Sequence, residues 1–65
     1  MKYAEKVKSM SDEQLKEETH ALFEAVYVVE CYGSKDIIRL ELCKRELLGR
    51  GYDLNEKPIL NIEKG

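Results

Sequence analysis

The chain has 65 residues, of which 43% are apolar and 37% charged, and its 11 basic and 13 acidic side chains leave a net charge of −2. The apolar fraction excludes a disordered chain, which lacks the apolar surface needed to offset the entropy of ordering, and the charge excludes bulk attraction to nucleic acid or anionic membrane. A single small domain of this size buries only about 60% of its unfolded surface, so we expect a partner or a second copy to stabilise it.

Residues 1–10 carry Tyr3, Val7 and Met10 at helical spacing, which predicts a short N-terminal helix. This segment lacks the apolar core of a signal peptide, and no apolar run in the chain approaches the roughly 20 residues of a membrane span. We therefore expect a cytoplasmic protein.

The sequence MSDEQL, residues 10–15, is typical of a helix start. Ser11 is placed to cap the helix and Gln14 to return a hydrogen bond in a capping box. An apolar stripe with helical spacing follows, formed by Leu15, Thr19, Leu22, Val26 and Val29. Residues 25–29 have the β-branched composition of a strand, but the stripe runs through them and strict alternation fails. We therefore predict a helix over about 12–32.

Gly33 and Ser34 interrupt this helix, since Gly33 suits a left-handed helix end and Ser34 suits the cap of the next helix. The short connection requires the next helix, about 35–50, to fold back antiparallel. Gly51 is placed to end it in a left-handed conformation. Residues 52–65 contain the turn signal NEKP and a short apolar run, so we expect an extended arm or a short strand there.

These elements predict an all-α fold with a short N-terminal helix over 1–10, an antiparallel helical hairpin over 11–51 and an extended tail over 52–65. Residues 11–32 are acidic and residues 34–51 basic, so the two hairpin helices attract each other. Both helices have more apolar side chains than a pair can hide, and the surplus lies beside the loop. We expect a homodimer in which two hairpins form a four-helix bundle. The alternative is a monomer whose N-terminal helix and tail cover the surplus.

The surplus apolar and aromatic side chains are the candidate interface residues. They are Phe23, Tyr27, Val28, Cys31, Tyr32, Ile38, Leu42 and Tyr52. The tyrosines among them are large and amphipathic, which makes them candidate hot spots for a protein partner.

Residues with catalytic or metal-binding chemistry are few. Glu17 and His20 have the Glu-x-x-His spacing of ferritin-like carboxylate bundles, but they point away from the apolar stripe and the other ligands are missing, so we expect no metal. Cys31 and Cys43 would lie roughly 10 Å apart along an antiparallel hairpin, too far for a disulfide, so we expect free thiols or, for Cys31, a bridge between protomers. With one histidine and no phosphate-binding loop, we expect no enzymatic activity and no cofactor.

The second helix is basic and offers an alternative function, that of a DNA-associated transcriptional regulator. Its bases Lys35, Arg39, Arg45 and Arg50 are interleaved with acids and form no continuous stripe. Since the neighbouring helix is acidic as well, solvated charge is the preferred interpretation.

The segments MSDEQL and SKDIIRLELCKRELLGRG resemble the Sda family, small helical-hairpin inhibitors of sporulation histidine kinases. The similarity consists of the SDE helix start, the opening Asp36, Ile37, Ile38 and Leu40 of the second helix, and a basic end. It covers the hairpin only, and the first helix here is longer by several residues. The chain is also similar to short hairpin proteins of phages and other mobile elements, many of which bind and inhibit one host protein. Both resemblances imply a non-enzymatic protein-interaction module, a regulator or inhibitor that docks through a helix face, and no binding residue is carried over.

Overall fold

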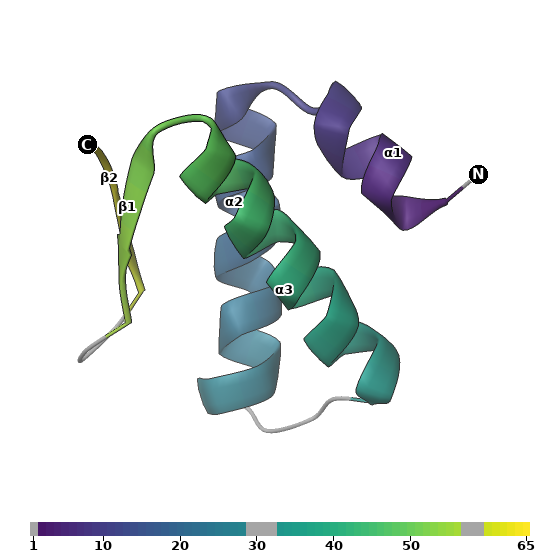
Figure 1. Ribbon diagram of the computed structural model, residues 1–65. Coiled ribbons are helices and arrows are strands. Elements are labelled where there is room, and N and C mark those ends of the chain that lie inside the picture. The colour runs from purple at the N-terminus through teal and green to yellow at the C-terminus, as the bar shows by residue number, and fades with distance from the viewer. Residues whose placement is uncertain (1, 29–32, 57–59) are drawn as a thin grey trace.

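The computed structural model describes residues 2–28, 33–56 and 60–65. These residues form three α-helices, one π-helical segment and a two-stranded antiparallel sheet (Figure 1). The elements in chain order are α1 (Tyr3–Ser9), α2 (Asp12–Phe23), η1 (Glu24–Val28), α3 (Ser34–Gly49), β1 (Tyr52–Asn55) and β2 (Asn61–Lys64). The fold is therefore mixed α/β, and the prediction of an all-α fold is wrong. The C-terminal segment does not extend as a single arm, because it pairs with itself as a strand hairpin.

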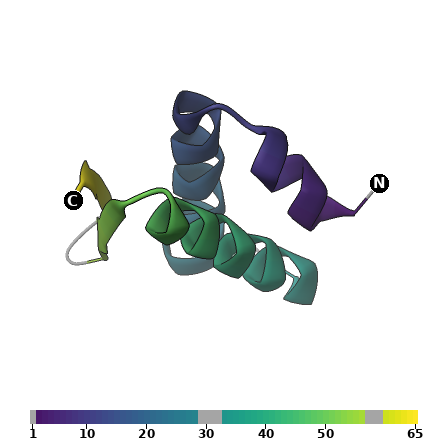
Figure 2. The same cartoon turned by 45° about the horizontal axis from the view of Figure 1, so that its top comes forward.

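Helix α3 is the central element, since it packs against α1, α2, η1 and β1. Figures 1 and 2 show α1 on one side of the α2–α3 pair and the strand hairpin on the other. Among the described residues, none of the helices combines the length and the apolar composition that a membrane span requires.

The buried core draws side chains from every helix and from the strand hairpin. It includes Val7, Leu15, Leu22, Phe23, Val26, Leu40, Cys43, Leu47, Tyr52 and Leu60. The predicted stripe of α2 is confirmed at Leu15, Thr19, Leu22 and Val26, which are all buried, whereas Val29 lies outside the described residues. The one polar member of this stripe is satisfied locally, because the Thr19 hydroxyl donates a hydrogen bond to the carbonyl of Leu15 at 2.7 Å.

The predicted capping box at the start of α2 is confirmed. The Ser11 hydroxyl accepts a hydrogen bond from the backbone N–H of Gln14 at 3.2 Å, and the Gln14 side chain accepts one from the backbone N–H of Ser11 at 3.3 Å. Both bonds satisfy donors that the first turn of a helix leaves open.

The start of α3 differs from its prediction. Ser34 is the first residue of the helix and not its cap, while the Asp36 carboxylate accepts a hydrogen bond from the backbone N–H of Gly33 at 3.2 Å. Gly33 has a φ of −112°, so it does not hold the left-handed conformation predicted for it. The prediction for the other end of α3 is confirmed, because Gly51 has a φ of 92°.

The helix that begins at Asp12 remains α-helical only to Phe23. Its backbone then becomes π-helical over Glu24–Val28. A π-helical turn takes in one more residue than an α-helical turn, so it changes the direction of the side chains that follow. Within this segment Val26 stays in the core, while Tyr27 and Val28 are exposed.

The strands pair in the register Tyr52↔Lys64, Asp53↔Glu63, Leu54↔Ile62 and Asn55↔Asn61. Side chains of one face, from Tyr52, Leu54 and Ile62, pack on the core. The backbone N–H of Gly65 donates to the carbonyl of Gly51 at 2.8 Å, which extends the pairing to the end of the chain. The hairpin therefore covers one side of the helices with a short amphipathic sheet.

Candidate docking surface

Two apolar side chains of η1 lie on the surface, Tyr27 with 56% and Val28 with 64% of its area exposed. Val28 borders a groove of about 340 Å³, which lies between the end of α2 with η1 on one side and the strand hairpin on the other. The groove is also lined by His20, Phe23, Glu24 and Leu60. We call Tyr27 and these five lining residues together the π-helix surface.

The apolar part of the π-helix surface is fixed by the core beneath it. Phe23 and Leu60 are both buried, one from the end of α2 and the other from the residue before β2. The rings of Phe23 and Tyr27 are tilted by 42° with their centroids 4.8 Å apart, a geometry that aromatic pairs prefer. This contact restricts the orientation of the exposed Tyr27 ring.

An acidic stripe crosses the π-helix surface, which contributes His20 and Glu24 to it. Glu13, Glu17, His20 and Glu24 recur at spacings of four, three and four along the outer side of α2 and η1, which places them on one stripe of the helix. Glu13 forms an ion pair with Lys16 at 3.4 Å. Glu17 and Glu24 form no ion pair with any residue that the structure describes.

The sequence-predicted interface residues divide into three groups. Phe23, Tyr27 and Val28 come together in the π-helix surface. Ile38, with 60% of its area exposed, and the half-buried Leu42 lie on α3. Tyr52 belongs to neither region, since it is buried. Cys31 and Tyr32 lie outside the described residues.

Tyr52 is held inside the fold by its polar end. Its hydroxyl donates a hydrogen bond to Oδ2 of Asp12 at 2.9 Å. This bond raises the pKa of Tyr52, with burial as the second cause. A side chain used in this way joins β1 to the start of α2, and it is not exposed as an anchor for a partner.

Three members of the π-helix surface were not predicted as interface residues, namely His20, Glu24 and Leu60. For Leu60 there was a signal, because short apolar segments on both sides of a turn predict a hairpin whose apolar residues return to the core. For His20 and Glu24 the signal was their helical spacing after Glu17 on the outer stripe of α2 and η1.

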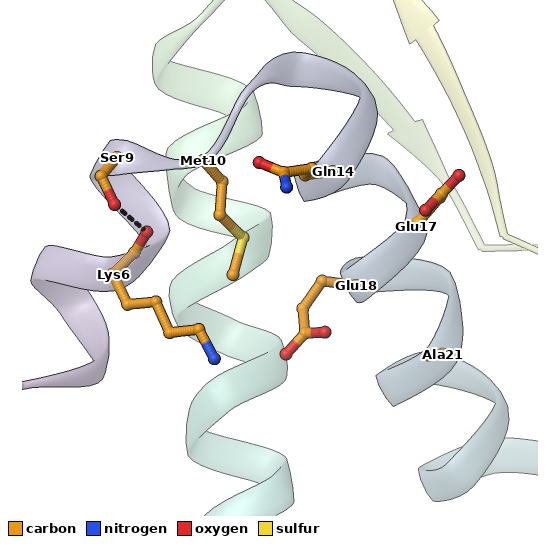
Figure 3. A pocket seen from close by; sticks show the side chains of 7 residues that line it. All are labelled: Lys6, Ser9, Met10, Gln14, Glu17, Glu18 and Ala21. Atoms are coloured by element: carbon orange, nitrogen blue, oxygen red, sulfur yellow. Dashed lines mark hydrogen bonds between the residues drawn. The ribbon is translucent and has the colours of Figure 1, made fainter.

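A larger groove, of about 550 Å³, lies between α1 and α2. Figure 3 shows Lys6 and Glu18 pointing toward each other across it, Met10 between them, and Glu17 pointing away. Glu18 accepts a hydrogen bond from the Tyr3 hydroxyl at 2.5 Å, and the Lys6 ammonium lies 5.9 Å from the centroid of the Tyr3 ring. The bond between Tyr3 and Glu18 therefore joins α1 to α2, whereas the contact of Lys6 with Tyr3 lies within α1.

Metal-ligating side chains do not cluster in the part of the chain that the structure describes. No group of three or more His, Cys, Asp or Glu side chains among them could hold a metal ion, and Glu17 and His20 line different grooves. Cys43 is fully buried, and burial raises the pKa of its thiol. A thiol in such surroundings is a poor nucleophile, since the thiolate is the reactive form.

Three basic residues in or next to α3 have partners within the chain. The Lys44 ammonium lies 2.7 Å from a carboxylate oxygen of Glu56, and the Arg39 guanidinium lies 5.2 Å from the centroid of the Tyr3 ring. Arg50 forms ion pairs with Asp12 and Glu46. Each of these basic side chains thus contacts a different partner within the chain. This arrangement does not favour a continuous stripe of basic residues for binding phosphates.

Comparison of the chain with protein-family models, curated proteins and solved structures found no significant match.

Proposed function

We propose that the protein is a small non-enzymatic interaction module that binds another protein through the π-helix surface and regulates or inhibits that protein by occupying one of its surfaces. The observation that carries this proposal is the exposure of Tyr27 and Val28 at the edge of an apolar groove. It is independent of the charge of α3, and no observation on α3 favours the DNA-binding alternative.

Because Tyr27 and Val28 are exposed, the isolated chain does not gain the free energy that burial of these side chains would contribute. Burial of a valine or a larger apolar side chain contributes about 1.5–3 kcal/mol, and a domain of this size has few such side chains to leave in water. A partner that covers η1 would gain this contribution at the interface. An apolar centre with a polar rim is also the usual anatomy of a protein–protein interface.

The π-helical backbone supports the same conclusion. Single π-helical turns are rare, and those that do occur are often found at functional sites. Here the π-helical turn coincides with the residues that leave the core, Tyr27 and Val28. The local backbone and the exposed side chains thus point to one surface.

The shape and charge of the π-helix surface restrict the partner. A groove of about 340 Å³ lies at the lower end of the range for sites that enclose a drug-sized ligand, roughly 300–1,000 Å³, and suits one or two anchoring side chains. Glu17 and Glu24 would face basic residues beside that anchor, and complementary charge adds specificity and speeds association. We propose a partner segment with an apolar anchor flanked by Lys or Arg.

The test compares Val28→Asp with Leu48→Asp, because Leu48 is similarly exposed at 55% but lies on α3 outside the π-helix surface. Affinity capture from lysate of the native host identifies candidate partners, and titration calorimetry with each purified candidate gives the Kd. We expect Val28→Asp to weaken binding by at least about tenfold and Leu48→Asp to leave it unchanged. Equal binding by both variants, with circular dichroism showing them folded, would refute the role of the π-helix surface.

A further inference from the structure

We infer that the outer face of α3 is a self-association surface, on which α3 of a second copy packs antiparallel about a twofold axis. This face consists of Ile38, Leu42, Arg45 and Gly49, and we call it the α3 face. None of its residues belongs to the π-helix surface, so the inference stands apart from the proposed function.

The α3 face lies away from the core. Its residues are spaced by four, three and four positions, which places them on one stripe of an α-helix. The core side of the same helix is marked by Leu40, Cys43 and Leu47, which are buried. In Figures 1 and 2 the helix lies toward the viewer, and no other element of the described chain crosses over it.

The fold of a single copy gives no reason for a glycine at position 49. Apart from Pro, Gly is the poorest helix former, yet Gly49 is the last residue of α3 as the structure defines it. Its φ is not in the left-handed range, and a Cβ added to it would meet nothing within 4 Å. Neither the backbone nor packing within the chain requires a glycine, whereas close approach of a second helix does.

The α3 face is complementary to itself when it is reversed. In an antiparallel pair centred between Leu42 and Arg45, Ile38 of each copy lies opposite Gly49 of the other copy, so a large side chain meets an open position. The exposed Ile38 is then covered at both ends of the contact. Such self-complementarity is the requirement of a twofold interface, where the same patch serves both subunits.

The charges next to the α3 face follow the same symmetry. Glu41 and Arg45 are four residues apart, so the reversed pairing brings Glu41 of each copy beside Arg45 of the other copy and forms two equivalent ion pairs. Arg45 has no ion pair with any residue that the structure describes, while Glu41 has only a longer contact, 3.6 Å, with Lys44. This complementarity identifies the occupant as a second copy, because an unrelated partner would not have to match the order of apolar, acidic and basic residues.

The second copy would also cover an adjoining groove between α1 and α3. This groove has a volume of about 160 Å³, and Ala4, Lys8, Leu42 and Arg45 are among the residues that line it. A contact along the roughly 24 Å of a 16-residue helix lies at the small end of specific interfaces, below about 1,200 Å² in total. We therefore expect a dimer of moderate affinity, with a Kd on the order of 10–100 µM.

Sedimentation equilibrium of the full chain from about 10 µM to about 1 mM, a range that spans the expected Kd, tests this inference. We expect a reversible equilibrium between the 7.6 kDa monomer and a dimer. Gly49→Leu should raise the Kd at least about tenfold and leave the monomer folded, because leucine is a good helix former and the site has room. Ile38→Asp should raise the Kd similarly. Leu48→Asp should not, since Leu48 is about 80° around the helix from Ile38.

Charge exchange distinguishes this pairing from other modes of association. Glu41→Arg and Arg45→Glu should each weaken the dimer, and the double variant should restore it, because the two positions face each other across the twofold axis. A monomer over the whole concentration range would overturn the inference. A dimer that Gly49→Leu and Ile38→Asp do not weaken would also overturn it. Neither result affects the proposed function, which is tested at Val28 with a separate partner.

Discussion

Arg50 and Asp12 form an ion pair that joins the end of α3 to the start of α2, with Nη1 of Arg50 2.8 Å from Oδ1 of Asp12. Nε of the same guanidinium donates to the carboxylate of Glu46 at 2.9 Å. Nη2 donates to carbonyls at the end of α1, of which that of Met10 is the nearest at 2.9 Å. One side chain thus connects three helices, and it satisfies acceptors that the last turn of a helix leaves open.

Replacement of Arg50 by methionine should destabilise the protein more than replacement of any surface arginine. Arg50→Met retains most of the aliphatic stem but removes every hydrogen bond of the guanidinium, so we expect the free energy of unfolding to fall by about 2 kcal/mol. Urea unfolding at neutral pH and low protein concentration measures this change. The matched control is Arg45→Met, an exposed arginine of α3, which should stay within about 0.5 kcal/mol of the original protein. Equal losses for the two variants would contradict the linking role of Arg50.

Asp12 should make stability depend on pH in the acid range. The hydrogen bond from the Tyr52 hydroxyl, and next the hydrogen bond from Arg50, lower the pKa of Asp12 below its ordinary value of 3.8. A carboxyl group whose pKa is lower in the folded state than in the unfolded state contributes stability above the unfolded pKa. That contribution is lost as the pH falls from about 4 through the folded pKa.

Asp12→Asn isolates this contribution because the amide cannot titrate. The midpoint of urea unfolding should fall less steeply below about pH 4 for Asp12→Asn than for the original protein. At neutral pH the variant should be the less stable of the two, since it lacks the charge that pairs with Arg50. Parallel curves of midpoint against pH would show that Asp12 does not contribute in the way its contacts indicate.

The two serines that the sequence marks as helix caps should differ in their importance. Ser11 accepts a hydrogen bond from the backbone of Gln14, whereas Ser34 is already inside α3 and Asp36 bonds the N–H of Gly33 in its place. Ser11→Ala should therefore lower the free energy of unfolding by about 1 kcal/mol, and Ser34→Ala by less than about 0.5 kcal/mol. Thermal unfolding followed by circular dichroism compares the two variants. A larger loss for Ser34→Ala would mean that the α3 cap is not the one described.

Local signals in the sequence predicted the parts of the fold that depend on neighbouring residues. The capping box of Ser11 and Gln14 involves residues three positions apart, and the buried stripe through Leu15 and Leu22 follows from helical periodicity alone. The π-helical turn could not be predicted in this way. Val26 is buried in the π-helical segment, as a continuous α-helix would also predict, so the spacing of apolar residues contains no sign of the change.

Contacts between distant parts of the chain account for the remaining errors. Each strand has only four residues. That length is too short for the alternation of polar and apolar residues to be distinguished from a turn followed by an apolar run. The bond between Tyr52 and Asp12 joins residues 40 positions apart, and it buries a tyrosine that composition alone marked as a surface anchor. For the candidate site, the sequence indicated Tyr27 and Val28 as surplus apolar residues, but the groove beside them required the folded position of Leu60.

Cys43 should be almost unreactive toward thiol reagents in the folded protein. It is fully buried, burial raises the pKa of its thiol, and its sulfur lies 3.6 Å from the Tyr3 hydroxyl oxygen. In a Cys31→Ser background, the reaction of Cys43 with an aromatic disulfide reagent should be at least about 100-fold slower in buffer than in concentrated urea.

Substitutions of Tyr3 show which element covers the thiol. Tyr3→Ala should speed the reaction of Cys43, because it removes the ring and the hydrogen bond to Glu18 that hold α1 in place. Tyr3→Phe should have a smaller effect, since it retains the ring and removes only the hydroxyl, whose oxygen lies near the sulfur. If the thiol reacts as fast in buffer as in urea, α1 does not shield Cys43. If Cys43 reacts as fast in Tyr3→Phe as in Tyr3→Ala, the contacts of the hydroxyl, and not those of the ring, keep α1 over the thiol.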